Sequence, residues 1–154
     1  MNKLNKLESI VITKLLSGES RYLEKLRKQL NHLVSVKREY TGAGFFTYLH
    51  IDRNENYRLG NQDIAFGDVE AKLKGMSESV GFVIFIKDGW VNMLEGYTYA
   101  EKWPKEAKLS RLAYFDNERD MNMIEKELTG QKVSQKPRAI NIDWEKAERF
   151  DYEN

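Results

Sequence analysis

The chain has 154 residues, of which 41% are hydrophobic and 32% are charged, and its formal net charge is +1. A chain of this length and composition is typical of one soluble domain that buries its own core. It contains no cysteine, which excludes disulfide scaffolds, thiolate metal sites and cysteine nucleophiles. No apolar run approaches the roughly 20 residues needed to cross a bilayer, so we expect a cytoplasmic protein without a membrane partner.

The charge is uneven along the chain. Residues 1–40 hold nine Lys and Arg against four Asp and Glu, whereas residues 41–130 hold 11 against 15. A basic N-terminal portion suits an acidic partner or a nucleic acid. Solvated Lys and Arg on the outer faces of two helices would explain the same pattern without any ligand, and we prefer that explanation.

Two short helices are predicted at the N-terminus. The apolar residues of segment 4–16 recur at helical spacing, and Gly18 is a natural stop. Ser20 can cap a second helix, whose apolar face runs from Tyr22 to Leu33. The short connection between them favours a helical hairpin.

The periodicity then changes to that of strands. Residues 34–40 alternate, residues 41–44 break the pattern, and residues 45–51 resume it, which predicts a hairpin. Segment 64–73 is a further strand whose phase slips beside Gly67, which indicates a bulge.

The segment Gly81–Tyr99 carries the clearest folding signal. It consists of two apolar runs joined by Asp88-Gly89, a dipeptide that favours a type I′ turn because both turn residues need positive φ. The first run is apolar on both sides, so we expect a central strand that is covered on both faces.

A last strand over 109–115 and a short helix over 119–128 complete the predicted domain. Asp116 or Asp120 can cap that helix. The sequence therefore predicts one α+β domain over 1–130, with an N-terminal helical hairpin packed on one face of an antiparallel sheet of about five or six strands. Residues 131–154 form a polar C-terminal extension, partly docked or flexible, in which Ile140–Trp144 could dock as an edge strand.

Candidate metal and anion sites have simpler explanations. His32 and His50 are the only histidines, and we expect each of them to lie at the surface. Segment 52–63 spaces its oxygen ligands as a calcium loop does, but Tyr57 stands where the loop needs glycine. Glycines at 42 and 44 suit a tight turn better than a phosphate loop, because a strand follows them. We predict no catalytic set, no metal site and no cofactor.

The candidate binding surface lies at the outgoing end of the central hairpin and in the segment that follows it. Glu95 and Glu101 are the most notable carboxylates near strand ends, and Tyr97, Tyr99 and Trp103 cluster beside them. Tyrosine and tryptophan are favoured at interfaces because they bury a large area at little entropic cost. We predict that these five residues border the functional surface.

Two segments also carry a resemblance to known proteins. These are LLSGES, LRKQL and VKREYTGAGFFTYL within 15–49, and GFVIFIKDGWVNMLEGYTYAEKWP over 81–104. In these two regions the chain resembles small uncharacterised bacterial single-domain proteins. Some of those proteins look like cytoplasmic immunity proteins of toxin systems. The resemblance implies a protein partner, and it supplies no catalytic residues.

Three functions remain open from the sequence. The first is a non-catalytic protein-binding module, plausibly an immunity-type protein that neutralises a toxin domain by occlusion. The second is a small enzyme or ligand-binding domain with a carboxylate and tyrosine pocket that includes Glu95 and Tyr97. The third is a nucleic-acid binder through the basic helices and the arginine that follows them, namely Lys25, Arg27, Lys28 and Arg38. We favour the first of these and expect no enzymatic activity.

Overall fold

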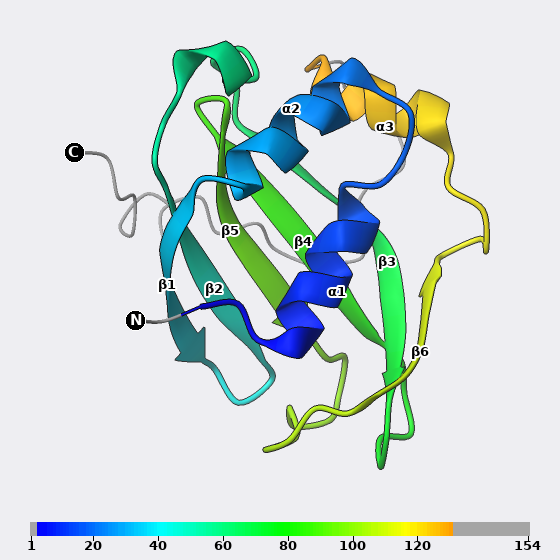
Figure 1. Cartoon of the computed structure of the whole chain (residues 1–154). Helices are drawn as coiled ribbons and strands as arrows, with labels where there is room; N and C mark the ends of the chain where they lie inside the picture. The colour runs from blue at the N-terminus through cyan, green and yellow to red at the C-terminus, as the bar shows by residue number, and fades with distance from the viewer. Residues whose placement is uncertain (1–2, 131–154) are drawn as a thin grey trace.

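The structure, a computed structural model, describes residues 3–130 of the chain. Two helices precede a sheet and a third follows it (Figure 1). The helices are α1 (Lys6–Leu15), α2 (Arg21–Leu30) and α3 (Met121–Leu128). Residues 131–154, including the predicted edge strand at Ile140–Trp144, lie outside the described part.

The sheet has six antiparallel strands in the order β1-β2-β5-β4-β3-β6. A single turn of 3-10 helix, η1 (Glu55–Tyr57), lies in the loop after β2. The strands are β1 (Leu33–Tyr40), β2 (Gly44–Ile51), β3 (Ile64–Leu73), β4 (Val80–Lys87), β5 (Trp90–Tyr97) and β6 (Leu109–Tyr114). The predicted α+β fold, with two N-terminal helices, an antiparallel sheet and a short C-terminal helix, is confirmed.

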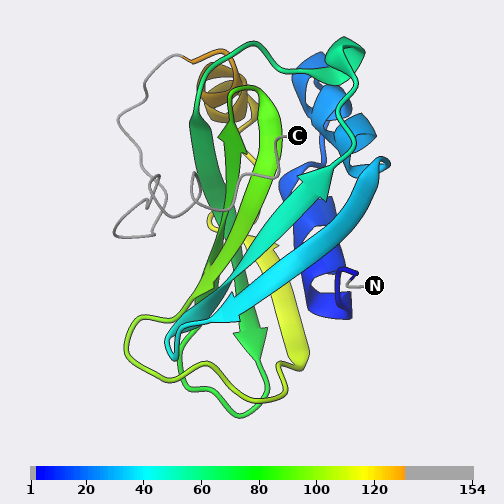
Figure 2. The same cartoon turned by 90° about the vertical axis from the view of Figure 1, so that its left-hand side faces the viewer.

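The main core lies between the helices and one face of the sheet. Figure 2 shows α1 and α2 on one side of the strands, and Ile124 and Leu128 of α3 belong to the same buried cluster as Val11 of α1 and Leu26 of α2. We call this side of the sheet the helix face. No helix within residues 3–130 is long and apolar enough to cross a membrane.

A second, smaller cluster lies on the opposite side of the sheet, which we call the second face. It consists of one buried side chain from each of β2 and β3 and three from the central hairpin: Tyr48, Ala65, Val83, Phe85 and Met93. β4 is therefore buried on both sides, as its sequence predicts.

The helix ends follow the predicted caps, with one correction. The Ser20 side chain accepts hydrogen bonds at the start of α2, and Asp120, not Asp116, caps α3. Leu33 does not extend α2. The amide of His32 donates to the carbonyl of Gln29 (2.9 Å) and closes the helix, and Leu33 pairs with Ile51 as the first residue of β1.

The turns also follow the local sequence. Asp88 and Gly89 have φ values of 52° and 83°, so the predicted turn with two positive φ angles is confirmed. The register of β3 against β4 shifts between Phe66 and Val69, which confirms the predicted bulge.

Gln29 locks α2 onto the central hairpin, a contact that the sequence analysis misses. Its buried side-chain nitrogen donates to the carbonyls of Tyr57 (2.6 Å) and Gly89 (3.0 Å). Its oxygen accepts from the amide of Val91 (2.7 Å). The side-chain amide thus bonds three backbone groups, which lie in the loop after β2, in the β4–β5 turn and at the start of β5.

Candidate functional site

The structure divides the five predicted surface residues between the two sides of the sheet. Tyr97 packs against the second-face cluster, and its ring meets that of Tyr99 edge-on, with centroids 5.7 Å apart. Glu95 lies two residues before Tyr97 on the same strand. Trp103 instead packs against the core of the helix face. The structure therefore brings Tyr97 and Tyr99 together but places Trp103 elsewhere.

Glu101 connects two loops. Its carboxylate accepts hydrogen bonds from the backbone amides of Glu78 (2.9 Å) and Ser77 (3.1 Å) in the β3–β4 turn. These bonds favour the charged carboxylate and lower the pKa of Glu101. The residue thus fixes the conformation of the turn and of the segment that leads to Trp103.

The glycine-rich turn at 42–44 holds the same segment from the other side. The carbonyl of Gly42 accepts from the amide of Trp103 (2.7 Å), and the carbonyl of Ala43 accepts from the amide of Thr98 (2.8 Å). The hydroxyl of Thr98 also donates to Ala43 (2.9 Å). The turn therefore presents acceptors to a neighbouring loop, which explains its role without an anion.

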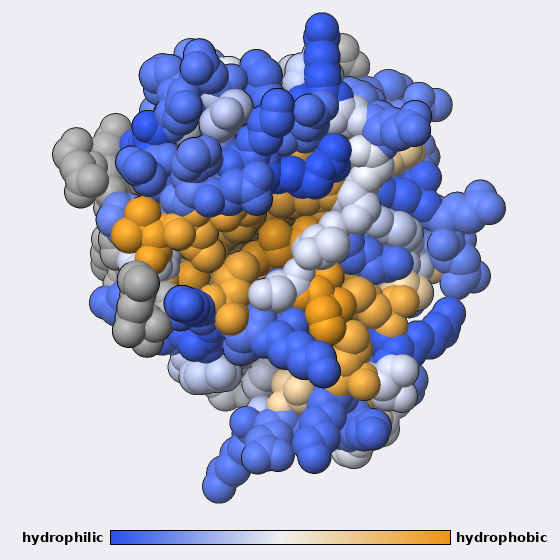
Figure 3. All heavy atoms as spheres, in the orientation of Figure 1, coloured by the Kyte–Doolittle hydropathy of each residue, from blue (hydrophilic) through white to orange (hydrophobic). Residues whose placement is uncertain are grey.

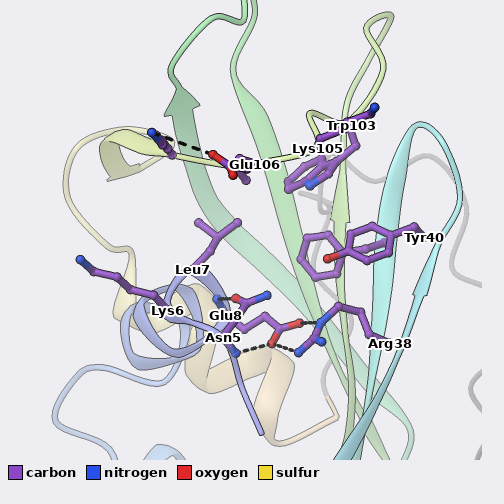
Figure 4. Close-up of a pocket in the computed structure, with 12 residues that line it drawn as sticks. Asn5, Lys6, Leu7, Glu8, Arg38, Tyr40, Trp103, Lys105 and Glu106 are labelled. Carbon is purple, nitrogen blue, oxygen red and sulfur yellow. Dashed lines mark hydrogen bonds and ion pairs between the residues drawn. The ribbon is translucent and has the colours of Figure 1, made fainter. Parts of the chain in front are cut away.

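Trp103 lines a pocket of about 350 Å³ on the helix face, at the N-terminal end of α1. Figure 4 shows its other walls, which come from Arg38 and Tyr40 at the end of β1 and from the segment 105–108. Phe45 of β2 completes it. Three separate parts of the chain thus converge around one hollow.

One wall of the pocket is aromatic. The rings of Phe45 and Trp103 meet edge-on, with centroids 5.0 Å apart and an interplanar angle of 71°. The ring centroid of Tyr40 lies 6.4 Å from that of Phe45. Tyr40 is also 63% exposed, so this ring is available to a partner while Phe45 and Trp103 are held by the core.

A buried ion pair forms the base of the pocket. The Glu8 carboxylate is fully buried and accepts two hydrogen bonds of 2.6 Å from the Arg38 guanidinium. It also accepts from the amide of Asn5 (2.8 Å) and from the hydroxyl of Thr47. The bonds to Glu8 raise the pKa of Arg38. Because each charge neutralises the other, this pair gives the site rigidity rather than net charge.

The rim of the pocket carries a positive balance. Lys6, Lys105 and Lys108 are exposed at its edge, together with the single carboxylate of Glu106. The ammonium of Lys108 lies 4.0 Å from that carboxylate, and both side chains are largely exposed. The site therefore combines an aromatic wall with a cationic rim.

The other candidate sites serve structural roles. His32 stacks on Tyr57 with ring centroids 5.6 Å apart, whereas His50 lies within β2 opposite Ser35. The side chain of Asp63 accepts from the amide of Asp88 (2.9 Å). Within residues 3–130, no group of three or more His, Asp and Glu side chains could hold a metal ion.

The basic residues considered for nucleic acid are partly used inside the fold. Arg27 donates to the carbonyls of Leu16 (2.5 Å) and Gly18 (3.2 Å), and Arg38 binds Glu8. Lys28 pairs with Glu24 at 3.3 Å. These contacts reduce the charge that this part of the chain offers to a phosphate backbone.

Sequence reasoning misses most of the pocket, although one signal for it exists. Asn5 and Glu8 have the spacing of a capping box before an apolar run, and the structure forms that box at the start of α1. No local pattern brings Arg38 or the lysines at 105 and 108 to the same place.

Comparison of the chain with protein-family models, curated protein sequences and solved structures gave no match. The resemblance to immunity-type proteins thus stays a prediction.

Proposed function

We propose that the chain is a non-catalytic protein-binding module that acts as a cytoplasmic, immunity-type protein and neutralises a toxin domain by occlusion. The pocket at Trp103 would form the centre of the contact. One observation carries the proposal: an exposed tyrosine, 63% accessible, stands beside a preformed aromatic pocket with a cationic rim.

The rigidity of this pocket supports a binding role. The backbone amide of Trp103 donates to the carbonyl of Gly42, and its ring contacts the rings of Phe45 and Phe82. The ring centroids of Trp103 and Phe82 are 6.4 Å apart. Glu8 and Arg38 fix the opposite wall. A preformed site loses little conformational entropy when it binds, so more of the contact energy appears as affinity.

The composition of the site defines the partner segment. An aromatic wall accepts a large apolar side chain, and such buried anchors dominate interface energies. Three lysines against one glutamate at the rim attract carboxylates and raise the association rate. We therefore expect an acidic segment of the partner to insert one aromatic or aliphatic side chain beside Tyr40.

The surrounding surface is suited to a wider contact. Figure 3 shows hydrophobic atoms at the surface of the helix face on both flanks of α1, toward α2 and toward β6. Protein interfaces combine such an apolar centre with a polar rim. The sequence resemblance supports the immunity role within this general binding function.

Two exposed tyrosines provide the test. The partner is first captured from the native host with the full-length chain, and its affinity is then measured by calorimetry. Tyr40→Ala should weaken binding about tenfold or more, as expected for a central anchor. Tyr99 is 47% exposed and does not line the pocket, so Tyr99→Ala should change the affinity less than about twofold.

Equal effects of the two substitutions, or no stable protein partner, would overturn the proposal. Lys105→Glu adds a charge test, because it should weaken binding more at low salt than at high salt. For the immunity role, co-expression of the full-length chain should protect cells from the captured partner, and the Tyr40→Ala variant should protect less. A partner that is harmless to cells without the chain would exclude that role.

A further inference from the structure

The second face of the sheet is buried to an extent that the described helices do not explain. Tyr48, Val83, Phe85 and Met93 are each 0% exposed, and Ala65 is 8% exposed. They come from four neighbouring strands, β2, β5, β4 and β3, and form one contiguous cluster. This is an apolar surface at the centre of the sheet.

The helices within residues 3–130 contribute to the other cluster. The buried apolar side chains of α1, α2 and α3 all belong to the core of the helix face. Side chains on a sheet stand roughly perpendicular to it, so neighbours in one layer cover each other's flanks but leave their tips open. Complete burial of four large side chains therefore requires a further layer above them.

We propose that the C-terminal segment, residues 131–154, forms this layer by docking on the second face. The first argument is its length. The segment has 24 residues, and an extended chain of that length spans about 80 Å. This exceeds the width of a six-stranded sheet, in which neighbouring strands are about 4.8 Å apart.

The second argument is the place where the segment begins. A Cβ atom on Gly130 would overlap the side chain of Gln62, and Gln62 lies three residues before Ala65 of the second face. β6 pairs with β3 only over Val69–Leu73. The start of β3 thus has no β6 beside it, and the chain can pass around this edge without crossing a strand.

The third argument is the sequence pattern of the segment. Ile140, Ile142 and Trp144 alternate with Asn141 and Asp143. In an extended conformation this places three large apolar side chains on one side and polar groups on the other. Such a segment can cover an apolar cluster while keeping a polar surface toward water.

The proposal is independent of the function assigned to the pocket. It assigns the second face to the chain itself and leaves the helix face for a partner. A second copy of the chain could cover the same cluster in an oligomer, and the experiment below separates the two cases.

The absence of cysteine allows a direct test by thiol labelling of full-length chains. Ala65→Cys places a small thiol in the second-face cluster. We expect it to react slowly with a neutral maleimide. Replacing Ile140, Ile142 and Trp144 with serine in the same full-length chain should raise the labelling rate about tenfold or more, because the protective layer is weakened.

Two control positions separate uncovering from unfolding. Ala71→Cys lies in the core of the helix face, where Ala71 is 2% exposed, and it should react slowly both with the unchanged C-terminal segment and with the triple serine variant. Ser9→Cys lies on the exposed side of α1 and should react fast in both chains. Equal labelling rates of Ala65→Cys with the unchanged segment and with the triple serine variant would overturn the proposal. Protection that disappears on dilution would overturn it in favour of a second copy.

A cross-linking experiment remains decisive if the triple serine variant does not fold. p-Benzoylphenylalanine replaces Phe46, which borders the second-face cluster, in the otherwise unchanged full-length chain. Mass spectrometry should find intramolecular cross-links to peptides from 131–154. Cross-links only within 3–130, or only between two molecules, would refute the docking of the segment.

Discussion

The buried ion pair at the base of the pocket gives a quantitative prediction for Arg38→Met. Glu8 is fully buried and Arg38 is 21% exposed. The substitution removes two of the four hydrogen bonds that the carboxylate accepts and leaves its charge buried without a counter-ion. Breaking such a pair from one side costs about 3–5 kcal/mol of unfolding free energy.

An exposed pair in the same protein serves as the control. Glu24 and Lys28 are 3.3 Å apart, with side chains 56% and 48% exposed, and solvent screens their attraction. Lys28→Met should therefore cost less than about 0.5 kcal/mol. Urea unfolding at neutral pH, with the slope of each transition compared between variants, measures both values.

The double variant Glu8→Met with Arg38→Met completes the cycle. Without either charge, the remaining cost should fall to about 1–2 kcal/mol, which includes the lost arm of the capping box. A cost for Arg38→Met no larger than that of Lys28→Met would refute the reasoning, as would a double variant whose cost equals the sum of the two single costs.

Four further substitutions test other parts of the fold. Gln29→Leu removes the side-chain partner of three backbone groups, of which only the Gly89 carbonyl keeps another bond within residues 3–130, from the Leu59 amide. The substitution should therefore cost about 2 kcal/mol or more in urea unfolding. Gly75→Ala should cost only the strain of a positive φ, about 1–2 kcal/mol, because a Cβ there meets no atom within 4 Å. Gly89→Ala has the same φ of 83° but would overlap the carbonyl oxygen of Gly60, so its melting temperature should fall further than that of Gly75→Ala. The lowered pKa of Glu101 contributes stability above the pKa of an unfolded carboxyl, and this contribution is lost as the pH falls through the folded-state pKa. Glu101→Gln should reduce the change of unfolding free energy with pH between the folded-state and unfolded-state pKa values of this carboxyl. An unchanged dependence on pH would contradict the assigned role of the carboxylate.

The sequence predicts the elements of this fold well because their signals are local. Ser20 caps its own helix, and Asp88-Gly89 sets the turn between its own two strands. Neither signal depends on a distant residue. The error at Leu33 has the same origin, because apolar spacing extends past a helix that Asn31 already ends.

The candidate site depends on distant contacts, which a single sequence does not reveal. Glu8 and Arg38 are separated by 30 positions, and no sequence pattern near either residue predicts that the two form an ion pair. Glu95 and Tyr97 are two positions apart within β5, so the alternation of a strand places both on one side of the sheet. Trp103 follows after the chain has left the sheet, where alternation no longer applies, so it reaches the opposite face.

The strand order has a consequence for the way in which the chain assembles. β1 pairs with β2, and β3 with β4 and β4 with β5, through connections between consecutive strands. β2 and β5 are joined across a long sequence separation, with Thr47 opposite Leu94. The sheet thus consists of two units, β1-β2 and β5-β4-β3-β6, which meet where β2 pairs with β5. A cut in the polar loop around Asn61 would leave each unit with its own strand pairs, so the protein is suited to reconstitution from two complementary fragments.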